Sequence, residues 1–489
     1  MEKYLLGIDI GTTGTKTMLF SPEGSCISRA YQAYPTNNPY VGWSEQDPLD
    51  WWKAVVDTVR QTCEDPDIAK GVVAISLSVQ GGTTVPVDSN FDPVRPAIVW
   101  NDIRCEAERE LFLREVGGDE TMYRKTGWHL GSNLNALQIR WLKEHEPDNF
   151  RNTAMFLSVP DYIAYKMTGI AALDHSNIGI NQLGNIAEGS YDPDILSFAG
   201  IRENQLPQII PSGHVIGHLT PLAAETLGLS TDCVLVSGAH DQYAVAVGAG
   251  AVKDGDILIG SGTCWVVTCI SDAPDFASGL SQSVAAVPGK WGSLRSLSSG
   301  GVCLDWFREK ILGPENILPY EQINREAADC KAAEEELFFY PFSGITVSGK
   351  QLTKAAFLGM DMSHTKRHLI RAVMEGVVFQ IVWMMESFRS KPSAEGLILA
   401  GGASRSPLWT QLLADVSGYS VRVPEAADLA CVGAAVLAGV GAGVFGSVTE
   451  GYRKLTVAER VVHPDPAASE IYQSLLQVYK RKSKALEEA

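Results

Sequence analysis

The strongest constraint on the fold is a short device that occurs twice along the chain. In residues 4–20, YLLGIDIGTTGTKTMLF, an apolar run contains Asp9, a turn of glycines and threonines follows, and a second apolar run leaves it. Residues 255–270, GDILIGSGTCWVVTCI, repeat this layout around a turn of small residues. Short apolar runs on either side of a glycine-rich turn predict β-hairpins. The recurrence indicates two related halves, each beginning with the same hairpin.

The composition of the first turn indicates a phosphate site. Glycines let a ligand approach the backbone, successive turn N–H groups form an anion-binding concavity, and threonine hydroxyls and a lysine add donors. Gly11 and Lys16 are too close for a Walker A loop, and no helix follows, as a dinucleotide-binding loop would require. The residues predicted to hold phosphate are Gly11, Thr12, Thr13 and Lys16 in the first hairpin, and Gly260, Ser261, Gly262 and Thr263 in the second.

Asp9 stands at the end of the first apolar run. A carboxylate gains nothing from touching phosphate directly, but it can hold Mg²⁺ through water. Asp9 is therefore the predicted metal-holding residue. The alternative for the whole stretch is a structural hairpin in which the threonines serve β-propensity.

Composition excludes several classes of protein. The chain has 489 residues, enough for two to four domains, and its formal net charge of −17 argues against nucleic acid or an anionic membrane as a partner. No basic and apolar leader opens the sequence, so a cytoplasmic location is expected. The nine cysteines include no Cys-x-x-Cys pair and are expected to be free thiols. The His214/His218 and His364/His368 spacings lack the surroundings of a metalloprotease helix and are read as chance.

Strands and helices are predicted to alternate throughout, which indicates an α/β protein. Several further segments complete a specific pattern: GWSEQDPLDWW, PAIVWNDIR, WLKEHEP, SGAHDQ, GSGT, LAGGASRS and AAFLGMDMSHTKRHLIRAVMEG, in that order. With the opening GIDIGTTGTK, these motifs resemble the FGGY family of carbohydrate kinases over nearly the whole chain. The WSEQDP and WNDxR segments most resemble its xylulokinase branch.

The resemblance implies two actin-like (ribonuclease H-like) ATPase domains with a cleft between them, at residues 1–245 and 246–489. It implies ATP and Mg²⁺ as cofactors, a small sugar or polyol as substrate, and a possible homodimer. LAGGASRS would supply the adenosine pocket, the alternative being an ordinary strand-to-helix turn, and SSGGVCLDWF would close over the nucleotide. The residues expected there are Gly401, Gly402 and Ala403, together with Gly301.

Phosphoryl transfer to a sugar requires an acceptor for the hydroxyl proton. Asp241, in SGAHDQ, follows a buried strand among small residues, and it matches the position of the family's catalytic base. From the residues alone, a helix N-cap is an equal interpretation. The neighbouring Gln242 is expected to bind a substrate hydroxyl.

Sugar binding is predicted from two further segments. Trp100, Asn101 and Asp102 combine a flat apolar face with polar groups, although Trp100 also fits a core aromatic. Gln80 and Gly81 follow a predicted strand, but here xylulokinases carry Met-His-Gly after the glutamine and glycerol kinases carry Arg-Glu.

Two further departures from the family concern Gln138, where a lysine is usual before Trp141, and a missing GERTP segment. The expected function is ATP-dependent phosphorylation of a ketopentose such as D-xylulose. Open alternatives are ribulose, L-xylulose, fuculose, gluconate, glycerol or erythritol as substrate, or, in another class, an actin-like nucleotide-binding regulator with no sugar acceptor.

Overall fold

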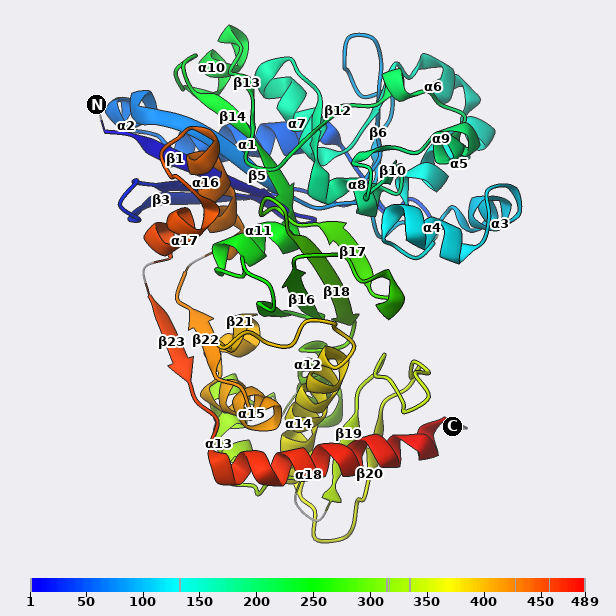
Figure 1. The fold of residues 1–489 in the computed structure, drawn as a ribbon, viewed down its shortest axis with the longest axis vertical. Coiled ribbons are helices and arrows are strands. Elements are labelled where there is room, and N and C mark those ends of the chain that lie inside the picture. Colours follow the sequence, from blue (N-terminus) through cyan, green and yellow to red (C-terminus); the bar gives the residue numbers. More distant parts are fainter. Residues whose placement is uncertain are drawn as a thin grey trace. The chain divides into compact units, whose positions relative to one another are not determined.

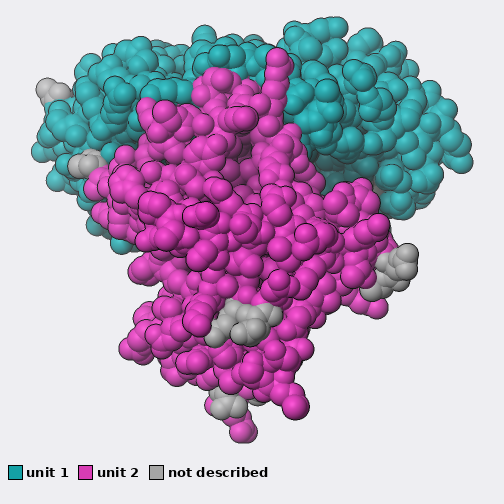
Figure 2. Space-filling view, turned by 60° about the horizontal axis from the view of Figure 1, so that its bottom comes forward, with its two compact units in different colours: residues 1–253, 272–292, 426–457 teal, residues 254–271, 293–425, 458–489 magenta. Residues whose placement is uncertain are grey.

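The computed structural model describes residues 2–131, 133–313, 315, 317–333, 336–426, 428–456 and 458–487. Strands and helices alternate along the chain, as expected for an α/β protein (Figure 1). The chain forms two compact units, coloured separately in Figure 2. Unit 1 comprises Met1–Lys253, Asp272–Gly292 and Ala426–Val457, and unit 2 comprises Asp254–Ser271, Ser293–Glu425 and Ala458–Ala489. The units therefore differ from the two chain halves divided at residue 245, because two later segments return to unit 1.

Unit 1 contains a six-stranded sheet with the order β13-β14-β5-β1-β2-β3. Its strands are β1 (Tyr4–Ile10), β2 (Gly14–Phe20), β3 (Cys26–Ala33), β5 (Val72–Val79), β13 (Val215–His218) and β14 (Val234–His240). β1 and β2 pair antiparallel around the glycine–threonine turn, which confirms the first predicted hairpin. β5 is parallel to both β1 and β14.

The register of the three parallel strands brings distant segments to one edge of this sheet. Ile10 is paired with Val79, and Val79 with His240, so β1, β5 and β14 end side by side. The turn after β1, the Gln80 segment and Asp241 therefore leave the sheet at the same edge. Ligand sites of open α/β sheets form at the carboxyl ends of such strands.

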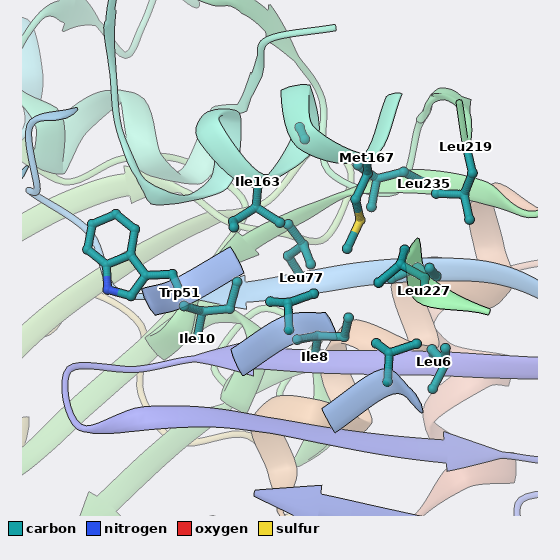
Figure 3. Packing of buried hydrophobic residues seen from close by; sticks show 14 of the residues in the cluster. Leu6, Ile8, Ile10, Trp51, Leu77, Ile163, Met167, Leu219, Leu227 and Leu235 are labelled. Carbon is teal, nitrogen blue, oxygen red and sulfur yellow. The ribbon is translucent and has the colours of Figure 1, made fainter. Parts of the chain in front are cut away.

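The two faces of β1 pack differently because successive side chains alternate across a strand. Leu6, Ile8 and Ile10 point into a fully apolar cluster with Trp51 and Ile163 (Figure 3). The helices that contribute to this cluster are α1 (Pro48–Thr62), α7 (Val159–Thr168) and α10 (Pro221–Leu227).

The opposite face of β1 is covered at backbone distance by α16 (Leu429–Gly441). A Cβ at Gly7 would lie 1.9 Å from the carbonyl oxygen of Cys431. A Cβ at Gly433 would likewise lie 1.8 Å from the carbonyl oxygen of Ala244, in α11 (Asp241–Gly248). The small-residue composition of α11 and α16 is thus required by their contact.

The remaining helices and strands of unit 1 lie mainly between residues 106 and 227 and carry a second apolar cluster. They are α2 (Pro66–Gly71), β4 (Glu45–Gln46), β6 (Val85–Val87), β7 (Ala97–Ile98), α3 (Glu106–Glu115), α4 (Asp119–Thr126), α5 (Asn135–His145), α6 (Pro147–Asn152), β8 (Met155–Leu157), β9 (Ala172–Asp174), α8 (His175–Asn181), β10 (Gly184–Asn185), β11 (Ser190–Tyr191), α9 (Pro193–Ala199), β12 (Gln208–Ile210), β17 (Ser281–Val284) and α17 (Val448–Leu455).

Unit 2 has its own mixed sheet, in which the strands follow the order β18-β16-β15-β21-β22-β23. These are β15 (Ile257–Ser261), β16 (Trp265–Ser271), β18 (Trp291–Leu297), β21 (Leu397–Gly401), β22 (Val421–Pro424) and β23 (Glu459–Val462). β15 and β16 pair antiparallel, which confirms the second predicted hairpin. The helices and remaining strands of this unit are α12 (Val302–Trp306), α13 (Tyr320–Ala328), β19 (Phe338–Tyr340), β20 (Ala356–Leu358), α14 (Lys366–Met385), α15 (Pro407–Ser417) and α18 (Pro466–Lys482).

Within the described part of the chain, α14 is the one helix whose length and composition would allow it to cross a membrane. Its most apolar window is 89% buried inside the protein. It pairs the charges of Arg371 and Glu375 internally, with 2.6 Å between Nε and Oε1. This burial is typical of the core helix of a globular domain.

Candidate active site

A pocket of about 360 Å³ opens at the carboxyl edge of the unit 1 sheet. Its volume falls in the usual range for small-molecule sites. It is lined by residues from six segments that the sheet and neighbouring helices bring together: Thr12; Gln80, Gly81 and Gly82; Trp100; Trp128, His129, Gly131, Asn133 and Leu134; Ile180; and His240, Asp241 and Gln242.

Asp241 presents an available carboxylate at this pocket. The N-cap of α11 is His240, and Asp241 is the first residue of the helix, so the N-cap interpretation of Asp241 does not describe the structure. Oδ1 of Asp241 is buried and has no hydrogen-bond partner, although Nε2 of His240 lies 3.3 Å away. A buried carboxylate oxygen without a partner is costly. The side chain as a whole is 35% exposed and lines the pocket, so a ligand reaches the carboxylate through its accessible part and not through Oδ1.

A chain of side-chain hydrogen bonds joins the first hairpin turn to the pocket wall. The hydroxyl of Thr12 donates to Oε1 of Gln80 (3.0 Å) and accepts from Nε1 of Trp100 (3.0 Å). Nε2 of Gln46 donates to the Thr12 carbonyl (2.6 Å), while its Oε1 accepts from Nε2 of Gln80 (3.2 Å) and from Nε1 of Trp51 (3.0 Å). Thr12, predicted from its turn to bind phosphate, therefore also positions two pocket residues.

Replacing Thr12 with valine is expected to raise KM for the sugar about tenfold. The change removes two hydrogen bonds at constant shape, each contributing roughly 0.5–1.5 kcal/mol, and frees Trp100 and Gln80. Thr12→Ser is the matched control because it keeps the hydroxyl, and its KM should stay within about threefold of the parent. Steady-state kinetics with varied sugar checks both, and equal KM values for the two variants would contradict the assignment.

The WND segment is only partly at the pocket. Trp100 is 43% exposed and lines the pocket, so it is not a core aromatic. Asp102 is buried instead in an ion pair with Arg104, whose Nη2 lies 2.6 Å from Oδ2, and it accepts from the N–H of Ser44 at 2.6 Å. Asn101 is exposed and is not among the pocket-lining residues. The structure thus does not place Asn101 and Asp102 where they were expected, because Arg104 recruits the aspartate.

Gly81 and Gln242 do line the pocket. Gly81 does so with backbone, and its lack of a side chain is required: a Cβ there would lie 2.8 Å from both His240 and Ile180. Gly82 adopts φ +67 and donates its N–H to Oδ1 of Asn181 (3.2 Å). The two glycines therefore shape the pocket floor.

The first hairpin carries a cluster of charges at its base. Nζ of Lys16 lies 2.7 Å from Oδ2 of Asp428, the N-cap of α16, and 3.7 Å from Oδ2 of Asp9. Asp9 accepts from the hydroxyl of Ser78 (2.8 Å). Burial, and then the neighbouring charge of Asp428, raise the pKa of Asp9 to about 7. A divalent cation would stabilise both carboxylates in their ionised form.

The tip of this turn is held by backbone contacts. The N–H of Gly11 donates to the Gly14 carbonyl (3.1 Å), and its own carbonyl accepts from the hydroxyl of Tyr34 (2.5 Å). Thr13 is exposed, and its carbonyl accepts from the N–H of Tyr34 at 3.3 Å. Thr13 therefore lies at the surface, and its role in holding phosphate stays a prediction.

In unit 2, the second hairpin meets the LAGGASRS turn. Ser261 is paired with Gly401, its hydroxyl donates to the Ala400 carbonyl (2.5 Å), and the same hydroxyl accepts from the N–H of Ala403 (3.1 Å). Gly262 and Thr263 are exposed, and Gly260 is half-buried. The N–H of Gly301 donates to the Gly262 carbonyl (3.2 Å). The structure thus brings together the predicted ATP-binding glycines of this half.

Several residues that line the pocket were not predicted from the sequence. The backbone of Trp128 and His129 is held by Gln182, whose Nε2 donates to their carbonyls at 3.1 and 3.0 Å. Nδ1 of His129 lies 2.6 Å from Oδ2 of Asp119, and Nε2 lies 3.1 Å from the Gly279 carbonyl. The pairing of aromatic and imidazole side chains in GWH was the available signal. Across the described residues, no group of three or more His, Cys, Asp or Glu side chains is arranged for a metal ion.

Two glycine-rich hairpins and a pocket with an exposed carboxylate side chain are features that an enzyme of phosphoryl transfer requires. Comparison with known proteins gives the family: residues 4–248 match the N-terminal domain, and residues 256–442 the C-terminal domain, of the FGGY family of carbohydrate kinases. The chain belongs to this family and is a sugar kinase.

Relatives match along the whole length. The chain is 30% identical to L-xylulose/3-keto-L-gulonate kinase of Escherichia coli (strain K12), covering 100% of this chain and 98% of that protein. It is 27% identical to gluconokinase of Bacillus subtilis (strain 168), covering 100% and 97%. The crystal structure of xylulose kinase from Rhodospirillum rubrum superposes with a TM-score of 0.90 at 26% identity, covering 99% of both chains. The two-domain kinase fold is thereby confirmed, whereas the names of the relatives differ in substrate.

Proposed function

We propose that this kinase transfers the γ-phosphoryl group of ATP to a hydroxyl of a neutral ketopentose such as D-xylulose, with Asp241 as the general base. The observation that carries the proposal is the pocket itself, which combines the 35% exposed carboxylate side chain of Asp241 with the indole of Trp100 and the amide of Gln242. Aromatic faces and amide groups are suited to the alternating apolar and polar surfaces of a sugar.

The charges of the pocket favour a neutral sugar over a sugar acid. Among the described residues that line it there is no lysine or arginine. Both ring nitrogens of His129 already contact Asp119 and Gly279. A substrate carboxylate would therefore meet the carboxylate of Asp241 without a compensating cation, and its desolvation would be unfavourable. This observation supports xylulose over gluconate.

In the proposed reaction, Trp100 and Gln242 hold the sugar so that one hydroxyl donates to the accessible part of the Asp241 carboxylate. Asp241 accepts that proton as the oxygen attacks the γ-phosphorus and the bond to the leaving oxygen of ADP breaks. The turn N–H groups and Lys16 offset phosphate charge. Asp9 and Asp428 fit a hydrated Mg²⁺, which when bound with the nucleotide would neutralise developing charge on the phosphates.

A substrate panel tests the proposal. We expect sugar-dependent ADP release with D-xylulose, and kcat/KM for gluconate at least about 100-fold lower, which corresponds to the roughly 2–3 kcal/mol of an unpaired buried charge. L-xylulose and ribulose are the neutral comparisons, and glycerol and erythritol are the small polyol comparisons. Preference for gluconate would refute the neutral-pocket argument, and ADP release that no sugar stimulates would refute the proposed reaction.

A further inference from the structure

We propose that His240 is the positioning residue of Asp241, and that its imidazole fills, from the end of β14, the space that a side chain at position 81 would otherwise occupy. The proposal rests on the proposed role of Asp241 as the base. It assigns to one histidine both the orientation of the reacting carboxylate and the shape of the pocket floor.

The backbone of His240 is fixed from α8. Its N–H donates to the hydroxyl of Ser176 (2.9 Å), and that hydroxyl donates to Oδ1 of Asp174 (2.5 Å). Asp174 is held in turn by Nδ2 of Asn177 (2.7 Å). His240 is also in register with Val79 at the end of β5. The backbone of His240 is thus held by α8 and by β5, independently of its side chain, as a positioning group requires.

The side chain of His240 is aimed at the base. It is 6% exposed, and its Nε2 lies 3.3 Å from Oδ1 of Asp241. Neither that oxygen nor Nδ1 of His240 has a hydrogen-bond partner, and Nε2 is the nearby side-chain nitrogen that, when protonated, would donate to Oδ1 after a small reorientation. Hydrogen bonds around a catalytic base are often long without substrate and shorten when it binds. A donor here would fix the rotamer of Asp241.

The same ring explains the glycine after Gln80. A Cβ at Gly81 would lie 2.8 Å from Cδ2 of His240, a distance that real Cβ atoms do not show. Ile180 closes the other side at 2.8 Å. A side chain at position 81 would therefore require the imidazole of His240 and the side chain of Ile180 to shift.

Two nearly isosteric substitutions separate positioning from packing. His240→Gln keeps an N–H donor at the same distance along the side chain, whereas His240→Met keeps the volume without the donor. We expect the Met variant to lose kcat roughly ten- to a hundredfold, as for loss of a hydrogen bond to a charged group. The Gln variant should keep kcat within about threefold, and KM for ATP should be unchanged in both.

Thermal unfolding of both variants accompanies the kinetics, and His240→Leu replaces the Met variant if the latter does not fold. Equal kcat for the donor and non-donor variants, whether both normal or both impaired, overturns the positioning role. If Asp241→Asn is inactive while His240→Met is normal, this inference alone fails. If Asp241→Asn is active, the proposed base fails first.

Discussion

Replacing Asp241 with asparagine is expected to lower kcat by about 10²–10⁴-fold, the range for loss of a general base. Asparagine has nearly the same shape but accepts no proton at neutral pH. Oδ1 of Asp241 makes no hydrogen bond within the protein, so the change removes little native structure. ATP affinity should be preserved, because the predicted nucleotide residues of unit 2 are untouched. Sugar-dependent ADP release and calorimetric ATP binding measure the two quantities.

Asp232→Asn is the control for this variant. Asp232 is an exposed aspartate shortly before β14, the strand whose other end leads into Asp241. Its replacement changes the net charge by the same amount at a distance from the pocket, and kcat should stay within about twofold. An Asp241→Asn enzyme with near-normal kcat would remove the base assignment, whatever the control shows.

The elements that carry this site were predictable because their signals are local. Both hairpins follow from apolar runs around turns of small residues, and the structure has them as β1–β2 and β15–β16. Most of the small-residue run at 431–443 lies in α16, and the close approach of the Cys431 backbone to Gly7 shows why its residues are small. The residue pattern within a segment predicts the secondary structure of that segment.

What the sequence did not reveal depends on pairings between distant segments. Asp102 looked like a sugar ligand, yet Arg104 and Ser44 use its oxygens. Asp428 caps α16, and it also lies 2.7 Å from the ammonium of Lys16, which is far away in the chain. The imidazole of His240 lies against Gly81, which is far away in the chain, so no local pattern predicts this contact. Local sequence specifies which groups are available, whereas tertiary contacts determine which remain free for a ligand.

The second large effect is expected at Gly401, where alanine should raise KM for ATP more than tenfold and lower the unfolding midpoint. Gly401 adopts φ 91 and ψ −157, a region that is essentially restricted to glycine and costs other residues on the order of 1–3 kcal/mol. A Cβ there would also lie 2.6 Å from the carbonyl oxygen of Ser261. To relieve this clash, β21 and β15 would have to separate at the turn that is proposed to hold adenosine.

Gly118→Ala is the control, at an exposed glycine to which no role in ATP binding is assigned. Its Cβ would meet nothing within 4 Å, and its φ is −66. KM for ATP in this variant should stay within about threefold, since alanine there adds no strain. Calorimetry of ATP binding and thermal unfolding distinguish the outcomes. If Gly401→Ala lowers the unfolding midpoint but binds ATP normally, the backbone strain is supported and the adenosine site is contradicted. If Gly401→Ala matches the control in both the unfolding midpoint and ATP affinity, both the strain and the adenosine site are contradicted.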